Sequence, residues 1–597
     1  AGRVGPVGLA AMAFSWCLAP ALVLDVAFAQ AARRPNFIIF QPDDMPFYDS
    51  WSPPPNAPGR PTRKSLAPSL PHMARIRSEG VVFSNAYVAS PTSGTSGFAT
   101  MTGRYPSRSG HARWKTVEEY PDSKRTRTTV QLTKFNPHER KNNIAAMLQG
   151  AGYRTGMAGK WHHSFISYWN LIDDYRGQQD DIYNSGFDWA DGIYIDNIKG
   201  DFATSGNFSH NVEWVTAKAI EFINNNSNDQ PFFLYFNPTV PRSPSVRTAL
   251  EMFPCTETPA GTLASEPEVP GMTQGTTCAG YRETIFARRT YRSIQEDGDL
   301  GSVWNDDALG ALMASLEAKG ILDNTFIAVM MDHGVETKWA LFENGVRVAL
   351  SVRFPSQLPA GITYGGHVIN MDLTQTIFEL ARVTPSYDVD GVSWLQEVQA
   401  AAATGQPSTY WTERCLFFEY QFDRAVRCGC LKYISIKTGG STTLTSAATF
   451  GYSQEVNQLY DLCAEGGSEA INLHAYPGHK AMLSDIRDKL FCHAARTNPH
   501  RIRRYRACGL EAPGAATTAA NDIAAAAAAP SGNLSVGPRS GLASTTGAAA
   551  AGQGAAGTNG QAETTMMMSS GARGAGPPAL RAAGSLFLVC SALAAGS

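Results

Sequence analysis

The sequence carries no excess of charge of either sign and has no long apolar run away from its two ends. Lys and Arg number 50 and Asp and Glu number 52 among 597 residues. This near-equal balance of charge argues against nucleic acid as the main partner. The longest apolar run near the start, residues 7–26, is short and contains Pro20, which disfavours a membrane anchor. Hydrophobic residues make up 43% of the chain, enough for a sizeable core.

The two ends are predicted to be processing signals. Residues 1–32 contain Arg3, the apolar run and the small-x-small pattern Ala27-Phe28-Ala29, so we predict a secretory signal peptide. Residues 511–597 are dominated by Ala, Gly, Ser and Thr, which cannot bury enough apolar surface to offset the cost of ordering, so we predict disorder. Their apolar end resembles a GPI-attachment signal, with a plain low-complexity tail as the alternative. We therefore expect a secreted or cell-surface protein without a membrane span in its mature form.

Cysteine usage agrees with export. Eight cysteines lie between the two ends: Cys255, Cys278, Cys415, Cys428, Cys430, Cys463, Cys492 and Cys508. An even number in an exported chain predicts disulfides without predicting their pairing. The sequons at Asn207 and Asn225 predict a glycoprotein. Cys428-Gly429-Cys430 leaves a zinc site as the alternative, although no second close-spaced pair supports it.

The pattern of apolar segments predicts an α/β fold. Residues 36–44 (NFIIFQPDD) form an apolar run that ends in two acids, as in a buried parallel strand. Residues 70–88, 142–163, 219–238 and 308–334 each have a helical pattern, a break and an apolar strand. We predict a central, mostly parallel sheet flanked by helices over residues 33–390. The sequence pattern changes over residues 391–510. It indicates antiparallel strands over 410–438 and a helix near 479–492, so we predict a smaller α+β C-terminal subdomain.

Polar groups follow several of these strands, at the edge where α/β folds bind ligands. They are Asp43-Asp44, Lys160-Trp161-His162 and Asp332-His333. Three carboxylates favour Ca²⁺ or Mg²⁺, and an added imidazole also admits Zn²⁺ or Mn²⁺. One acidic pair could equally be a helix cap or a turn, but two pairs directly after apolar strands favour a metal site.

Cations and hydroxyls near this edge suit an anionic ester. Lys160, His162 and Lys338 could hold a sulfate or phosphate group beside a metal. The segment SPTSGTSGFATMTGRYPSRSG (residues 90–110) is polar and then apolar, like the beginning of a helix. A hydroxyl there would lie in the positive field of the helix, which suits a nucleophile that attacks an anion and also suits an ordinary helix cap.

Taken in order, these segments resemble the type I sulfatases of the alkaline phosphatase superfamily. The segments RPNFIIFQPDD, AGYRTGMAGKWHH and LDNTFIAVMMDHGVETKWALFENGVRVAL carry the resemblance, which covers about residues 34–473. It implies one divalent cation, Ca²⁺ in preference to Mg²⁺. The implied metal ligands are Asp43, Asp44, Asp332 and His333. Lys160 and His162 match the residues that bind the ester and assist the leaving group, and Lys338 matches a second sulfate-binding lysine.

The resemblance places the nucleophile at Ser93, counted back from Thr102-Gly103-Arg104. In the family this residue is a Cys or Ser that is oxidised to formylglycine. The Pro and Arg of the recognition motif are replaced here by Thr95 and Gly97, which leaves formylglycine at Ser93 doubtful. Arg242 stands where the family usually has a His; it can bind an anionic oxygen but is a poor proton shuttle.

These residues predict a sulfuric ester hydrolase that acts on a small-molecule or glycan sulfate ester, with Ser93 as nucleophile. One alternative is a phosphate or phosphonate ester hydrolase, because an unmodified Ser beside a metal can attack directly. The other alternative is a catalytically inactive sulfatase-like protein. The retained metal set and lysines argue against inactivity, and the altered nucleophile loop argues for it. The sequence makes no prediction of oligomeric state.

Overall fold

The computed structural model describes residues 1–2, 33–46, 69–109, 114–115, 126–127, 134–164, 175–198, 208–288, 296–436, 442–464 and 469–497. The predicted tail, Asn207 and Cys508 lie outside the described residues, as does the predicted signal peptide apart from residues 1 and 2. Within the described ranges, no helix is both long enough and apolar enough to cross a membrane.

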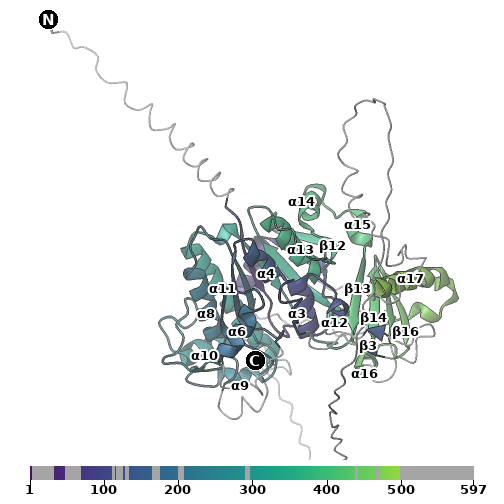
Figure 1. The fold of residues 1–597 in the computed structure, drawn as a ribbon, viewed down its shortest axis with the longest axis horizontal. Coiled ribbons are helices and arrows are strands. Elements are labelled where there is room, and N and C mark those ends of the chain that lie inside the picture. Colours follow the sequence, from purple (N-terminus) through teal and green to yellow (C-terminus); the bar gives the residue numbers. More distant parts are fainter. Residues whose placement is uncertain are drawn as a thin grey trace, which may run out of the picture. The chain divides into compact units, whose positions relative to one another are not determined.

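Eight strands form one large sheet (Figure 1). In sheet order they are β12 (Ile362–Ile369), β2 (Val81–Tyr87), β11 (Arg347–Arg353), β10 (Thr325–Met330), β1 (Asn36–Phe40), β7 (Phe232–Asn237), β5 (Arg154–Lys160) and β6 (Trp189–Tyr194). Only β11 runs antiparallel to its neighbours, β10 and β2. The other pairs are parallel, so the predicted mostly parallel sheet is confirmed.

The centre of the sheet is apolar on both faces. β1 (NFIIF) and β7 (FFLYFN) are buried along their whole lengths. Near-continuous apolar strands of this kind are typical of parallel sheets that helices cover on both sides. Phe37 of β1 pairs with Phe326 of β10 on one side and with Phe233 of β7 on the other. The polar turns that follow these strands are therefore carried on a rigid base.

Two groups of helices pack against the sheet. The first surrounds α11 (Glu296–Ala318), which contacts α2 (Pro71–Ser78), α8 (Val212–Asn224), α9 (Val246–Leu250) and α10 (Cys278–Arg288). The second consists of α3 (Ser93–Thr102), α4 (Ile144–Gly150) and α13 (Asn370–Ala381), which contact one another. The four predicted helix–strand pairs correspond to α2–β2, α4–β5, α8–β7 and α11–β10, so all four are confirmed.

A smaller antiparallel sheet follows in the C-terminal part. Its strands are β13 (Cys415–Tyr420), β14 (Asp423–Cys428), β15 (Leu431–Ser435) and β16 (Asn457–Asp461). The helix α17 (Lys480–Arg496) contacts β14 and β15. Phe418 of β13 packs on Tyr87 of β2 with ring centroids 5.5 Å apart, so this sheet adjoins the large one. The predicted α+β character is confirmed.

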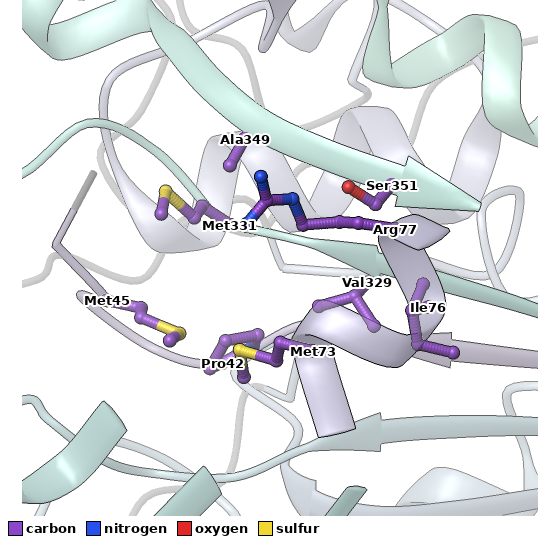
Figure 2. Close-up of a pocket in the computed structure, with 9 residues that line it drawn as sticks. All are labelled: Pro42, Met45, Met73, Ile76, Arg77, Val329, Met331, Ala349 and Ser351. Atoms are coloured by element: carbon purple, nitrogen blue, oxygen red, sulfur yellow. The ribbon is translucent and has the colours of Figure 1, made fainter. Parts of the chain in front are cut away.

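A pocket lies between α2 and the strands β10 and β11 (Figure 2). Its lining is Pro42, Met45, Met73, Ile76, Arg77, Val329, Met331, Ala349 and Ser351. The wall is mostly apolar and rich in methionine, a flexible side chain that fills irregular space. Met45 and Met331 are sequence neighbours of Asp44 and Asp332. The pocket therefore gives the two acidic turns an apolar backing, and its lining does not suit an anionic ester.

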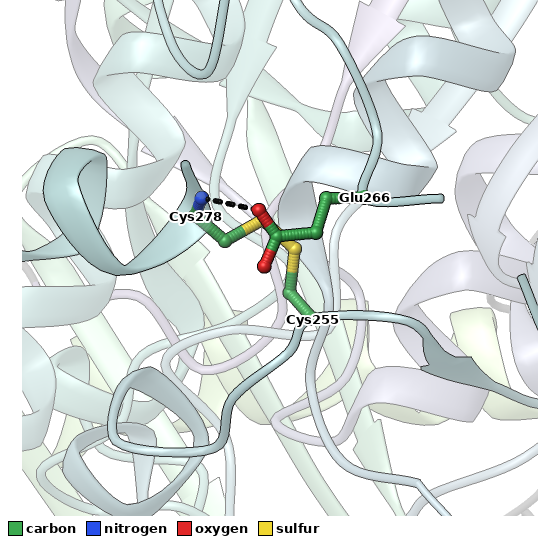
Figure 3. A group of neighbouring side chains, drawn as sticks. All are labelled: Cys255, Glu266 and Cys278. Atoms are coloured by element: carbon green, nitrogen blue, oxygen red, sulfur yellow. Dashed lines mark hydrogen bonds between the residues drawn. A yellow bond between two sulfur atoms is a disulfide. The ribbon is translucent and has the colours of Figure 1, made fainter. Parts of the chain in front are cut away.

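Disulfides join residues in the described part of the chain. The pairs are Cys255–Cys278, Cys415–Cys428 and Cys430–Cys463. Because Cys428 and Cys430 have different partners, the alternative of a zinc site at these two residues is excluded. Glu266 lies beside the first disulfide and accepts a hydrogen bond from the backbone N–H of Cys278 (2.9 Å), at the beginning of α10 (Figure 3). Its role there is that of a helix cap.

Candidate active site

The turn after β1 and the loop after β7 run side by side at the carboxyl edge of the sheet. The N–H of Asp43 donates to the carbonyl oxygen of Pro238 (3.1 Å), and the N–H of Arg242 donates to the carbonyl oxygen of Asp43 (3.2 Å). These backbone bonds extend the pairing of β1 with β7 beyond the strand ends. They bring Arg242, nearly 200 residues away in sequence, next to the acidic pair.

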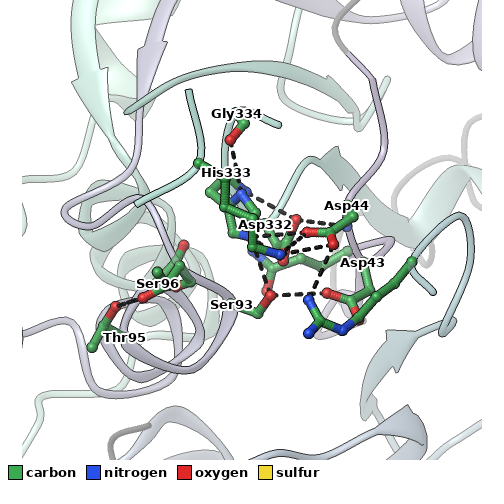
Figure 4. Close-up of polar contacts among 12 residues, drawn as sticks. Asp43, Asp44, Ser93, Thr95, Ser96, Asp332, His333 and Gly334 are labelled. Atoms are coloured by element: carbon green, nitrogen blue, oxygen red, sulfur yellow. Dashed lines mark hydrogen bonds and ion pairs between the residues drawn. The ribbon is translucent and has the colours of Figure 1, made fainter. Parts of the chain in front are cut away.

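Ser93 is the first residue of α3, and Thr92 is the N-cap with extended backbone. Ser93 Oγ donates a hydrogen bond to Asp43 Oδ1 (2.9 Å) and lies 3.1 Å from His333 Nε2 (Figure 4). The neighbouring hydroxyls bond elsewhere: Thr95 Oγ1 donates to Ser90 Oγ (2.6 Å), and Ser96 Oγ accepts from Asn370 Nδ2 (3.4 Å). Of the hydroxyls in this segment, Ser93 is therefore the one in contact with the acidic cluster.

The ring of His333 is held by a backbone hydrogen bond. Its Nδ1 lies 3.0 Å from the carbonyl oxygen of Gly334, which can only accept a hydrogen bond, so Nδ1 carries the proton. Its Nε2 lies 3.1 Å from Asp44 Oδ1 and 3.2 Å from Asp332 Oδ2. Two carboxylates that face one nitrogen need a positive charge between them, which a proton on Nε2 or a bound cation supplies. Asp44, Asp332 and His333 offer ligand atoms that all lie within 4.8 Å of one another.

The neighbouring acids and burial change the pKa of Asp332. Burial, together with the nearby charges of Asp43 and Asp44, raises this pKa to about 6. Burial would also raise the pKa of Asp43, but the charges of Lys160, Arg242 and Lys338 outweigh it and hold that pKa below its usual value. The carboxyl of Asp332 therefore takes up a proton just below neutral pH, whereas that of Asp43 stays charged.

Three cationic side chains converge on the acidic pair. Lys160 Nζ, almost fully buried, lies 2.7 Å from Asp43 Oδ2. Lys338 Nζ contacts both oxygens of Asp44, at 2.5 and 2.7 Å. Arg242 Nη1 donates to Asp44 Oδ2 (3.1 Å). The three come from three different strand ends, so only the folded sheet assembles them.

His162 lies at the same edge, two residues beyond Lys160, and is 4% exposed. Its Nε2 is 3.2 Å from Asp196 Oδ1. Sequence analysis did not single out Asp196, which follows the strand β6 (WADGIY). Its position at a strand end matches that of the predicted acids, but its strand is not an apolar run.

The space beside Gly97 is occupied by another side chain. A Cβ at this position would lie 3.0 Å from His163 Nε2 and 3.8 Å from the hydroxyl of Tyr235. His163 is itself buried and stacks on Phe135, with ring centroids 4.7 Å apart. A large side chain at residue 97 would therefore have to displace His163.

Comparison with known proteins gives consistent matches. The Sulfatase family profile matches residues 49–383, more than half of the chain, and the profile named N-sulphoglucosamine sulphohydrolase, C-terminal, matches residues 331–496. The N-acetylglucosamine-6-O-sulfatase of Bacteroides thetaiotaomicron is 24% identical over 424 residues, which cover 59% of this chain and 70% of that protein. The N-acetylgalactosamine-6-sulfatase of Homo sapiens is 23% identical over 417 residues, which cover 64% of this chain and 69% of that protein.

Solved structures share the fold. The crystal structure of the PsFucS1 sulfatase from Pseudoalteromonas sp. superposes with a TM-score of 0.51 at 16% identity. The match covers 80% of this chain and 94% of that one. The architecture is therefore common to both proteins across nearly the whole of the solved structure.

Proposed function

The chain belongs to the sulfatase family of hydrolases, and on this premise we propose that it cleaves a glycan or small-molecule sulfate ester at Ser93. The observation that carries the proposal is the contact of Ser93 Oγ with Asp43 Oδ1 (2.9 Å) and His333 Nε2 (3.1 Å). Named relatives act on 6-sulfated N-acetylhexosamines. This makes a 6-sulfated N-acetylhexosamine the first substrate class to test. Trp339, next to Lys338 and 42% exposed, offers an aromatic face for a sugar ring.

The charges of the cluster support binding of an anion together with a cation. Three carboxylates face three cationic side chains, so their formal charges cancel. A divalent cation would leave the site positive, which favours an anionic ester. We assign Lys160, Lys338 and Arg242 to the sulfate oxygens.

Asp43, Asp44, Asp332 and His333 would hold the cation. The donor set of three carboxylates and a neutral imidazole nitrogen suits Ca²⁺, and then Mg²⁺. The position of His333 Nε2, close to both Asp44 and Asp332, supports this assignment. When bound, such a cation polarises the ester oxygens and lowers the pKa of the attacking hydroxyl.

The side chains of this chain supply the remaining steps. Asp43 Oδ1 is placed to accept the proton of Ser93 Oγ. His333 Nε2, 3.1 Å from the same hydroxyl, is assigned to the cation. Attack forms a bond between the oxygen of residue 93 and sulfur, and the bond from sulfur to the leaving oxygen breaks. His162 delivers a proton to that leaving oxygen. An unmodified Ser93 then needs a second attack by water at sulfur, whereas the hydrate of an oxidised residue could collapse without one.

The direct test compares sulfate with phosphate. The full chain with Ca²⁺ is assayed on N-acetylglucosamine 6-sulfate, N-acetylgalactosamine 6-sulfate and their 6-phosphate counterparts, while mass spectrometry determines whether Ser93 has lost two hydrogens. We expect release of sulfate at a rate well above that of phosphate. Faster release of phosphate by a chain with intact Ser93 would favour the phosphate-ester alternative. No release from any ester, with cation bound, would favour an inactive protein.

Binding of Ca²⁺ is expected to weaken at acid pH. The pKa of Asp332 in the metal-free protein is about 6, raised by burial and by Asp43 and Asp44. Below that pH a proton competes with the cation, so the Kd should rise by about tenfold per pH unit, whereas it should be nearly constant from pH 7 to 8. Isothermal titration calorimetry between pH 5 and 8 measures the slope. Asp332→Asn should bind more weakly and lose the slope, and an equal Kd at pH 5 and pH 8 in the unaltered chain would contradict the assignment.

We propose that the protein is exported and that residues 1–32 are its signal peptide. Its location would be extracellular or on the cell surface, and a GPI anchor is one way of holding it there. The disulfides support an oxidising compartment. Asn225 of the second sequon is exposed at the end of α8 and is accessible to glycosylation. We retain residues 33–390 as the catalytic domain, 391–510 as the C-terminal subdomain and 511–597 as a tail.

A further inference from the structure

Asp196 lies at the end of β6, the strand that pairs in parallel with β5. Backbone bonds continue this pairing past the strand ends: the N–H of Trp161 donates to the carbonyl oxygen of Tyr194 (2.9 Å), and the N–H of His162 donates to that of Ile195 (3.2 Å). The residue after Ile195 is therefore held next to His162. The register of two neighbouring strands, and not a flexible loop, sets the position of this carboxylate.

The carboxylate of Asp196 is held from several sides. Its Oδ1 lies 3.2 Å from His162 Nε2, within the distance of an ion pair but without the geometry of a hydrogen bond. The backbone N–H of Asn197 donates to the same oxygen (2.7 Å). Its Oδ2 lies 3.7 Å from Lys134 Nζ. Catalytic hydrogen bonds are often long or poorly aligned before substrate binds.

The other nitrogen of His162 has no partner. Within the described residues, His162 Nδ1 is buried and makes no hydrogen bond. An imidazole with one nitrogen held by a carboxylate and the other one open is arranged to exchange a proton at the open nitrogen. His162 also follows Lys160, which contacts Asp43 in the acidic cluster. The open nitrogen therefore belongs to a side chain at the edge of the candidate site.

We infer that Asp196 is a positioning residue, which fixes the tautomer and ring orientation of His162 so that Nδ1 delivers the proton to the leaving oxygen. The inference rests on the proposed function. In the resting protein His162 holds one proton, on Nε2. It takes a second proton from solvent at Nδ1, and this imidazolium and the Ser93 alkoxide then react with R–O–SO₃⁻. The products are R–OH, the sulfated Ser93 and neutral His162, whose remaining proton stays on Nε2 towards Asp196.

The electrostatics of His162 show why a carboxylate beside it matters. Burial, and then the charge of Lys160, lower its pKa to about 4, and Lys134 adds to the same effect. Asp196 is the acidic group that opposes this shift. An imidazolium is needed at the moment of proton delivery, and Asp196 is the neighbour that stabilises it.

The test uses leaving groups that differ in their need for a proton. Asp196→Asn keeps the shape of the side chain and removes its charge. We expect kcat on a 6-sulfated N-acetylhexosamine, whose alkoxide must be protonated, to fall by about 10²- to 10⁴-fold, with KM within about threefold. On 4-nitrophenyl sulfate, whose leaving group needs no proton, kcat should stay within about threefold. Asp180→Asn, at an exposed position on α6 (Tyr175–Tyr183), is the matched control and should change neither rate.

Each outcome decides the role of Asp196. An equal loss on both esters would overturn the inference in favour of a structural role, and no loss on the sugar sulfate would overturn it outright. Were the unaltered chain to cleave neither ester, the proposed function would fail, and ¹⁵N NMR of labelled histidines would still test the tautomer. We expect the proton on Nε2 of His162, its signal assigned with His162→Gln, and its shift changed in Asp196→Asn. A proton on Nδ1, or an unchanged shift, would overturn the inference.

Discussion

Ser93→Ala is expected to abolish hydrolysis of the sulfate ester, with kcat/KM reduced by at least about 10⁴-fold. Alanine removes the oxygen that contacts Asp43 and His333 and leaves no hydroxyl or hydrate for the attack on sulfur. Because Ser93 is the first residue of α3 and Thr92 is its N-cap, the helix should form as before. Released sulfate is measured by ion chromatography, with circular dichroism as the test of folding.

The matched control is another serine of the same helix. Ser96 is buried, and its carbonyl oxygen accepts a hydrogen bond from Asn370 Nδ2 (3.0 Å). Ser96→Ala keeps this backbone acceptor, so activity should stay within about threefold of the unaltered chain. Full activity in Ser93→Ala would refute the assignment of the nucleophile, whatever the oxidation state of residue 93.

The second large effect is expected on stability, at Arg282 of α10. This side chain is 1% exposed and forms a two-pronged ion pair with Glu213 of α8, at 2.8 and 2.9 Å. It also donates to the carbonyl oxygens of Ala249 and Met252. Arg282→Met would leave Glu213 charged, buried and unpaired, which lowers the free energy of unfolding by about 3–5 kcal/mol. Urea denaturation followed by circular dichroism measures the change.

A double replacement separates the ion pair from the packing. Glu213→Leu combined with Arg282→Met removes both charges and should recover most of the lost stability. Arg176→Met, which breaks an exposed pair with Asp180, is the control and should cost about 0–1 kcal/mol. If Arg282→Met lowers the free energy of unfolding no more than Arg176→Met does, the prediction is wrong. Glu213 would then reach solvent when its partner is removed.

Most of the candidate site could be predicted because its residues follow apolar strands. Asp43, Lys160 and Asp332 each come directly after or at the end of a strand whose burial is evident in the sequence. Parallel strands end at one edge of a sheet, so their proximity follows from the fold class. Asp196 obeys the same rule, but its strand β6 (WADGIY) alternates in burial and does not stand out as an apolar run.

Other features had no signal in the sequence. The pairing of eight cysteines depends on which loops meet, and the spacing of Cys428 and Cys430 admitted a zinc site until their separate partners were known. The antiparallel direction of β11 depends on how the chain returns to the sheet. Likewise, the sequence shows Gly97 only as a departure from the recognition motif for formylglycine. The structure alone shows that His163 lies against this glycine.

The sequence by itself determined the fold class, the family and the identity of the polar groups at the strand ends, because burial patterns and motif order are local properties of the chain. The tertiary structure alone decided the contacts among these groups: Ser93 with His333, Arg242 with Asp44, and His162 with Asp196. These contacts join residues between 34 and 240 positions apart. Their distances depend on strand register and crossover topology, which no local pattern encodes.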